Sequence, residues 1–102
     1  MIYNKLVRDK IPQIIAQNGG KAHTRVLSPE DYHTYLKAKL DEEVGEFQKD
    51  NNLEELADIL EVVYALTQSL GCSRAELEAL RQNKYDQRGG FEQRILLISS
   101  EK

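Results

Sequence analysis

Apolar residues recur at helical spacing along most of the chain, and Pro, Gly, Ser or Asn separates one stretch from the next. The clearest apolar arc repeats every three or four residues and consists of Tyr32, Leu36, Leu40, Val44 and Phe47. From Leu53 to Leu70, apolar side chains surround most of the helical circumference, which is typical of a central helix. These periods predict a mainly α domain in which four helices form a bundle-like fold.

Helix-capping residues predict where the first two helices begin and end. Asp9 is placed to cap a short helix with Pro12 in its first turn, and Asn18-Gly19-Gly20 provides the stop. Ser28-Pro29-Glu30-Asp31 combines a Ser cap, Pro at the first helical position and acids in the first turn. We expect this second helix to run to about Asp50.

The second half of the chain is predicted to hold two further helices. After a turn at residues 50–52, a helix runs from Leu53 to Leu70 and is closed by Gly71. Ser73 and Glu76 form a capping box for the last helix, which residues 88–90 end.

Two segments outside the helices have a composition that suits an extended chain. Residues 22–27 contain β-branched and polar side chains, and residues 92–98 contain an apolar run. The alternative to a purely helical chain is therefore a pair of short strands formed by these two segments.

Length and charge restrict the partners of the chain. At 102 residues it has the size of one domain, spanning 1–102. The formal net charge of −3 argues against stable nucleic-acid binding, which depends on an excess of Lys and Arg. No apolar stretch is long enough to cross a bilayer, so we expect no membrane insertion. A single cysteine, Cys72, and the lack of a recognisable secretion signal favour the cytoplasm.

Two pairs of acidic residues lie on either side of the predicted turn. Glu43 and Glu46 are three residues apart, and so are Glu55 and Asp58, so each pair shares one helix face. In an antiparallel hairpin, facing residues would have numbers that sum to 101, which sets Glu43 against Asp58 and Glu46 against Glu55. Glu43 also falls inside the apolar arc, where an isolated charge is costly.

Four carboxylates with about 4.5 Å between the two levels need protons or a cation to offset their repulsion. All-oxygen ligation suits Mg²⁺, with Mn²⁺ as a substitute, whereas zinc favours N or S ligands. Acidic residues at this spacing also occur on solvated helices, but the symmetric placement favours a metal site. Its predicted ligands are Glu43, Glu46, Glu55 and Asp58. Lesser candidates, farther round their helices, are Glu42, Glu54 and Glu61.

Cations that could meet a phosphate substrate occur in two groups. Lys5, Arg8 and Lys10 lie around the start of the first helix. Lys84 and Arg88 lie on one side of the last helix, just before a Gly-Gly pair. Solvation or the helix dipole also accounts for charges at such positions. We predict that these five side chains bind substrate.

Other catalytic classes are not supported by the sequence. No Ser or Cys is placed with His23 or His33 as nucleophile and base, and no Gly-x-x-x-x-Gly-Lys-Ser/Thr loop is present. Covalent catalysis is therefore disfavoured and a P-loop NTPase is excluded. Metal-assisted cleavage of a phosphate anhydride fits both the acidic and the basic groups.

The acidic motif pair resembles that of a known enzyme superfamily. Glu42-Glu43-Val44-Gly45-Glu46 followed by Glu55-Leu56-Ala57-Asp58 resembles the EExxE and ExxD motifs of the all-α nucleoside triphosphate pyrophosphatases, the MazG-like superfamily. The opening residues 3–12 and the closing Lys84 with Arg88-Gly89-Gly90-Phe91 resemble its phosphoribosyl-ATP pyrophosphohydrolase-like branch. The interval between Glu46 and Glu55 is shorter than in many members, so substrate specificity is not carried over.

The resemblance implies a Mg²⁺-dependent enzyme that cleaves a nucleoside triphosphate, or a related nucleotide, to the monophosphate and pyrophosphate in a house-cleaning role. It implies Mg²⁺ on Glu43, Glu46, Glu55 and Asp58. We expect Glu43 or Glu46 to orient the attacking water. A homo-oligomer, either dimer or tetramer, is also implied. The alternatives are a phosphoribosyl-ATP pyrophosphohydrolase of histidine biosynthesis and, from another class, a non-catalytic helical interaction module.

Overall fold

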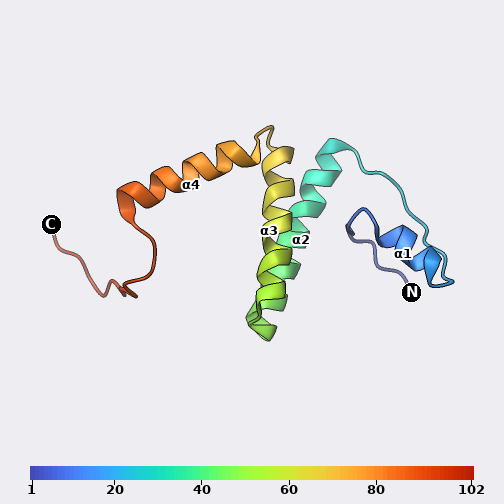
Figure 1. Ribbon diagram of the computed structural model, residues 1–102, viewed down its shortest axis with the longest axis horizontal. Coiled ribbons are helices and arrows are strands. Elements are labelled where there is room, and N and C mark those ends of the chain that lie inside the picture. Colours follow the sequence, from blue (N-terminus) through green and yellow to red (C-terminus); the bar gives the residue numbers. More distant parts are fainter.

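Four α-helices and their connections make up the molecule, and the chain contains no strand (Figure 1). The computed structural model describes every residue from Met1 to Lys102. The helices are α1 (Ile11–Gln17), α2 (Pro29–Asp50), α3 (Leu53–Ser69) and α4 (Arg74–Arg88). The predicted mainly α fold with four helices is confirmed.

Local capping fixes the starts of the long helices. The Ser28 hydroxyl accepts a hydrogen bond from the Asp31 N–H at 3.2 Å, as predicted for α2. At α4 the predicted capping box is complete, because Ser73 and Glu76 each accept the other's backbone N–H. Asn52, predicted only as part of a turn, also caps α3 by accepting from the Glu55 N–H at 3.0 Å.

The predicted Asp9 cap of α1 is wrong. Lys10 holds the cap position and makes no side-chain capping bond. A turn precedes the helix, in which the Ile11 N–H donates to the Arg8 carbonyl at 3.0 Å, and this turn moves the helix start one residue beyond the expected place. α1 is therefore a short helix without a side-chain cap.

The two short strands considered at 22–27 and 92–98 are absent. Residues 22–27 connect α1 to α2, whereas residues 92–98 follow α4, and Figure 1 shows these segments at opposite ends of the long axis. Strand pairing needs two backbones about 4.8 Å apart, and this separation excludes it. A turn at residues 91–94, where Arg94 has a φ of +56° and its N–H donates to the Phe91 carbonyl, further breaks the second segment.

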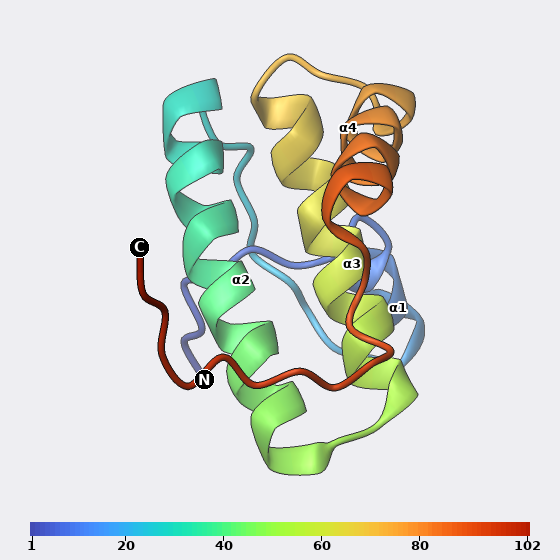
Figure 2. The same ribbon diagram turned by 90° about the vertical axis from the view of Figure 1, so that its left-hand side faces the viewer.

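An antiparallel hairpin of α2 and α3 is the centre of the fold (Figures 1 and 2). Asn51 closes α2 in the left-handed conformation, at a φ of +52°, which turns the chain within two residues. Leu36 of α2 and Val62 of α3 are buried between the helices, and His33 Nδ1 lies 2.8 Å from Ser69 Oγ across the pair. The predicted apolar arc therefore faces α3, although its member Val44 remains exposed.

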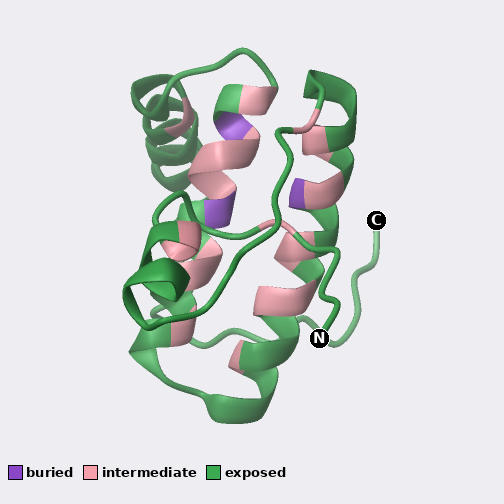
Figure 3. Ribbon diagram, turned by 90° about the vertical axis from the view of Figure 1, so that its right-hand side faces the viewer, coloured by how far each residue is buried: buried purple, intermediate pink, exposed green.

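The rest of the chain leaves this hairpin and stays open to solvent. Figure 3 shows buried positions only on α2 and α3, and α4 points away from the end of α3 in Figure 1. The radius of gyration is 18.0 Å, compared with about 13 Å for a compact domain of this length. None of the helices is both long and apolar enough to cross a membrane. The largest exposed apolar run lies after α4 and includes Phe91, Ile95, Leu96, Leu97 and Ile98.

Candidate metal centre

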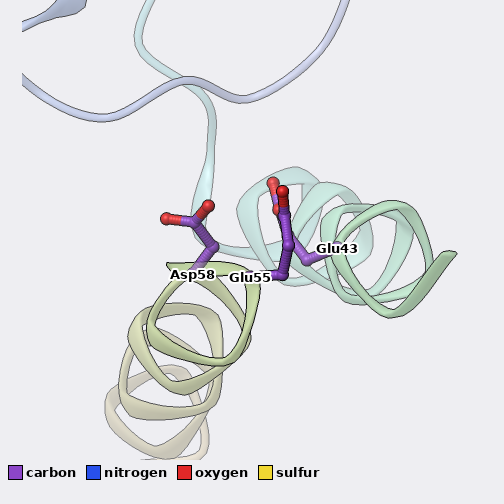
Figure 4. A group of neighbouring side chains, drawn as sticks. All are labelled: Glu43, Glu55 and Asp58. Carbon is purple, nitrogen blue, oxygen red and sulfur yellow. The ribbon is translucent and has the colours of Figure 1, made fainter. Parts of the chain in front are cut away.

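Three carboxylates from the two hairpin helices meet on one side of the pair (Figure 4). Glu43 comes from α2, while Glu55 and Asp58 come from successive turns of α3. One oxygen of each lies within 4.8 Å of an oxygen of both others. In Figure 4 all three side chains project toward the same side of the helices. The short turn at Asn51 sets the register that brings them together.

A second acidic group adjoins the first and consists of Glu46, Asp50 and Glu55, whose oxygens also lie within 4.8 Å of one another. Both cross-helix pairs expected from the hairpin register therefore occur, Glu43 with Asp58 and Glu46 with Glu55. The four predicted ligands do not share one point. Glu55 instead belongs to both groups, and Glu46 lies with Asp50 at the more exposed end. Sequence reasoning missed Asp50, although its position one helical turn after Glu46 was the available signal.

Glu43 is the most enclosed carboxylate for which an ion pair is present, with only 14% of its side chain exposed. Lys39, one turn earlier on α2, lies 3.4 Å from Glu43 and 3.2 Å from Glu42. This lysine offsets part of the negative charge on the apolar side of α2. Sequence reasoning missed Lys39, and the signal was its spacing of three and four residues before the two glutamates.

The crowding of carboxylates acts on Glu55. Partial desolvation raises the pKa of Glu55, and the nearby charges of Asp50, Asp58, Glu46 and Glu43 raise it further. A positive charge near these carboxylates therefore offsets part of their mutual repulsion. A divalent cation supplies that charge without protonation.

The segment before α1 brings two cations to the hairpin. Arg8 Nη2 donates to Asp58 Oδ1 at 2.8 Å, and Lys5 Nζ donates to Glu42 Oε1 at 2.7 Å. The partners are 50 and 37 residues apart in sequence, so these pairs hold distant parts of the chain together. The hydrogen bond from Lys5 lowers the pKa of Glu42 and raises the pKa of Lys5. Glu42, a lesser ligand candidate, is therefore engaged by lysines.

A cavity of about 480 Å³ lies between the segment before α1 and the helix hairpin. The acidic residues that line it are Asp9, Glu43, Asp58 and Glu61, and its apolar wall includes Leu36 and Val62. The cations that line it are Arg8, Lys10, Lys39 and Arg74. The lining thus offers a ligand apolar contacts as well as charged groups of both signs.

Arg74 is a further residue that sequence reasoning missed. It begins α4, and its guanidinium carbon lies 4.1 Å from the centre of the Tyr64 ring. This contact across the α3–α4 connection holds the cation at the rim of the cavity. No signal in the sequence marked this contact, because it depends on the angle at which α4 leaves α3.

Lys84 and Arg88 lie elsewhere in the single chain. They line a separate hollow near the end of α4, together with Tyr85, Gly89 and Phe91. Neither belongs to the cavity beside the carboxylates. The structure therefore brings Arg8 and Lys10 to the acidic cavity, leaves Lys5 on Glu42, and keeps the two α4 cations apart from it.

The donor set fits a small hard cation. Octahedral Mg²⁺ holds oxygens at about 2.1 Å, which places ligand oxygens about 3 to 4.2 Å apart. The oxygens of the group lie within 4.8 Å of one another, a range that includes these separations. We conclude that Glu43, Glu55 and Asp58 fit Mg²⁺ in geometry and chemistry.

Part of the chain is similar in sequence to a known protein. A protein of Mycolicibacterium smegmatis, described as uncharacterized, is 48% identical over 44 residues, which make up 43% of this chain. The matched region spans 45% of that relative, less than half of its length. No protein-family model matches the chain, and no solved structure matches it. The resemblance to the MazG-like superfamily thus stays a prediction that rests on the motifs.

Proposed function

We propose that this protein is a Mg²⁺-dependent pyrophosphohydrolase that cleaves a nucleoside triphosphate, or a related nucleotide, to the monophosphate and pyrophosphate. The observation that carries the proposal is the meeting of Glu43, Glu55 and Asp58 beside a cavity lined by cations. Mg²⁺ binds proteins through a few carboxylates and takes substrate phosphates as further ligands. A cavity lined by both carboxylates and cations suits that arrangement.

Each group in the cavity has a separate role in the proposed reaction. Glu43, Glu55 and Asp58 would hold the metal, which supplies Lewis-acid stabilisation of charge on the phosphate oxygens. Glu43 or Glu46 would accept a hydrogen bond from the attacking water and orient it toward phosphorus. Of these two, Glu43 has the support of lining the cavity.

The cations of the cavity would bind the phosphate chain. Lys10 and Lys39 line it along with Arg8 and Arg74, so positive charge is available on more than one side. These side chains would offset the charge that develops on the leaving pyrophosphate. The apolar wall would exclude water from one side of the substrate and strengthen these interactions.

We also propose that the working form is a homo-oligomer, a dimer or a tetramer. Leu36 and Val62 are the only apolar residues classed as buried, while α4 and the residues after it expose apolar side chains. A second copy would cover this surface. Lys84 and Arg88, which do not reach the cavity of their own chain, would then be available to a neighbouring one.

The exposed free thiol of Cys72 suits a reducing cytoplasm, which stays our proposed compartment.

Pyrophosphate release tests this function. A panel of nucleoside triphosphates and phosphoribosyl-ATP would be assayed with Mg²⁺, using wild type, Glu43→Gln, Asp58→Asn and the control Asp41→Asn. Asp41 is an exposed carboxylate on α2 outside both acidic groups, so its substitution controls for the loss of one charge. We expect Glu43→Gln and Asp58→Asn to lose at least about 100-fold in rate and Asp41→Asn to keep wild-type activity. Equal rates in all four proteins would contradict the proposal, and activity on phosphoribosyl-ATP alone would favour a role in histidine biosynthesis.

A further inference from the structure

Arg8 forms an ion pair with one of the carboxylates assigned to the metal. Its guanidinium donates to Asp58 Oδ1 at 2.8 Å, and Asp58 belongs to the three-carboxylate group with Glu43 and Glu55. The bond joins the segment before α1 to the middle of the hairpin. Both side chains remain partly exposed, at 56% for Arg8 and 40% for Asp58, so neither is fixed by burial.

A cation in the carboxylate group and a guanidinium on Asp58 compete with each other. The Asp58 oxygen that accepts the Arg8 hydrogen bond at 2.8 Å offers a reduced share of its lone-pair density to a metal. Two positive charges at that spacing also repel in a partly desolvated site. Each of the two therefore weakens the binding of the other at Asp58.

We infer that Arg8 is an exchangeable counter-ion: it neutralises Asp58 in the metal-free protein, and it transfers to a substrate phosphate when a divalent cation takes Asp58. This inference rests on the proposed function, which supplies the metal and the phosphate. The guanidinium is suited to both partners, because its planar donor pair matches a carboxylate and a phosphate equally well.

The surrounding contacts allow the side chain to move while its backbone stays in place. The Arg8 carbonyl accepts the Ile11 N–H at 3.0 Å in the turn before α1, and Lys5 holds the same segment to Glu42 at 2.7 Å. Arg8 already lines the cavity with Lys10 and Lys39. Rotation about its side-chain bonds is therefore enough to move the guanidinium from Asp58 to a phosphate bound in the same cavity.

The exchange links metal binding to nucleotide binding. A metal that binds alone competes with Arg8 for Asp58, and this competition weakens metal binding. When a nucleotide binds with the metal, the released arginine gains a phosphate as its new partner. Metal and nucleotide thus increase each other's affinity, as linkage requires. Removal of the Arg8 charge has opposite effects on the two ligands, and a residue with a purely structural role would not produce that pattern.

Binding measurements on the full chain test the exchange. Mn²⁺ binding, followed by the loss of its free electron paramagnetic resonance signal, would be compared in wild type, Arg8→Gln and Lys37→Gln. We expect Arg8→Gln to bind Mn²⁺ about two- to fivefold more tightly than wild type, as loss of a partly exposed competing ion pair implies. Lys37→Gln is the charge-matched control, because Lys37 is exposed on α2 and does not line the cavity, and it should change the affinity less than about twofold.

The second measurement uses a non-hydrolysable nucleoside triphosphate analogue in the presence of Mn²⁺. Arg8→Gln should bind this analogue at least about tenfold more weakly than wild type. Unchanged or weaker Mn²⁺ affinity in Arg8→Gln, or unchanged analogue affinity, would overturn the exchange while leaving pyrophosphate release intact. Failure of wild type and Arg8→Gln to bind any Mn²⁺ would contradict both the exchange and the proposed function.

Discussion

Glu55 belongs to both acidic groups, so its pKa depends on the charges of the neighbouring carboxylates. Desolvation and four neighbouring carboxylates raise the pKa of Glu55 above its ordinary value. The native state therefore holds this proton over a pH window just above the ordinary carboxyl pKa, where the unfolded chain has lost it. Because the native state binds more protons in that window, the contribution of Glu55 to stability falls as the pH rises through it.

Replacement of Glu55 with Gln should remove this pH dependence. In a metal-free buffer containing a chelator, we expect the stability of Glu55→Gln relative to wild type to increase as the pH rises from about 4 to 7. Urea unfolding at several pH values measures the difference. Glu54→Gln, at the neighbouring exposed position outside both groups, is the matched control and should show no such trend. A constant difference between Glu55→Gln and wild type across this range would contradict the assigned charge crowding.

At the scale of the helices, sequence reasoning succeeded for most of the local contacts that set the helix ends, and the Asp9 cap is the exception. Ser28, Ser73 and Glu76 cap their own helices within three residues, so their pattern alone predicted the boundaries. The pairing of Glu43 with Asp58 was also predictable, because a short turn at Asn51 transmits the register from one helix to the next.

Contacts between distant segments were not predictable from the sequence. The strands considered as an alternative at 22–27 and 92–98 are absent because pairing depends on where the two segments lie in space, which no local pattern specifies. The Arg8–Asp58 bond and the Arg74–Tyr64 contact were missed for the same reason. Lys84 and Arg88 were grouped with the site by their charge, whereas the direction of α4 places them in another hollow.

At the scale of the whole molecule, the exposed apolar surface is the main feature still without a partner. The chain extends 61 Å along its longest axis and has few buried residues, so the hairpin core alone gives a small hydrophobic contribution. The C-terminal residues after α4 expose Phe91, Ile95, Leu97 and their neighbours to water. Such a contiguous patch is typical of an association surface.

The mass in solution tests the proposed oligomer. Analytical ultracentrifugation at micromolar concentration should give at least twice the chain mass of 11.7 kDa. The double variant Ile95→Ser and Leu97→Ser should shift the mass distribution toward the monomer. These two side chains are 79% and 76% exposed in the single chain, and an oligomer would bury them. Ser99→Ala with Ser100→Ala, in the same segment, is the control and should keep the wild-type mass. A wild type that sediments as a monomer would contradict the proposal.

Thermal unfolding with and without Mg²⁺ tests the central claim, that Glu43, Glu55 and Asp58 together bind a divalent cation. A ligand that binds only the folded state stabilises it by about 1.4 kcal/mol at a concentration tenfold above its dissociation constant. We expect Mg²⁺, titrated to about 10 mM, to raise the unfolding temperature of wild type and of Asp41→Asn but to leave that of Glu43→Gln and Asp58→Asn unchanged. Equal shifts in all four proteins, or no shift in wild type, would contradict the account.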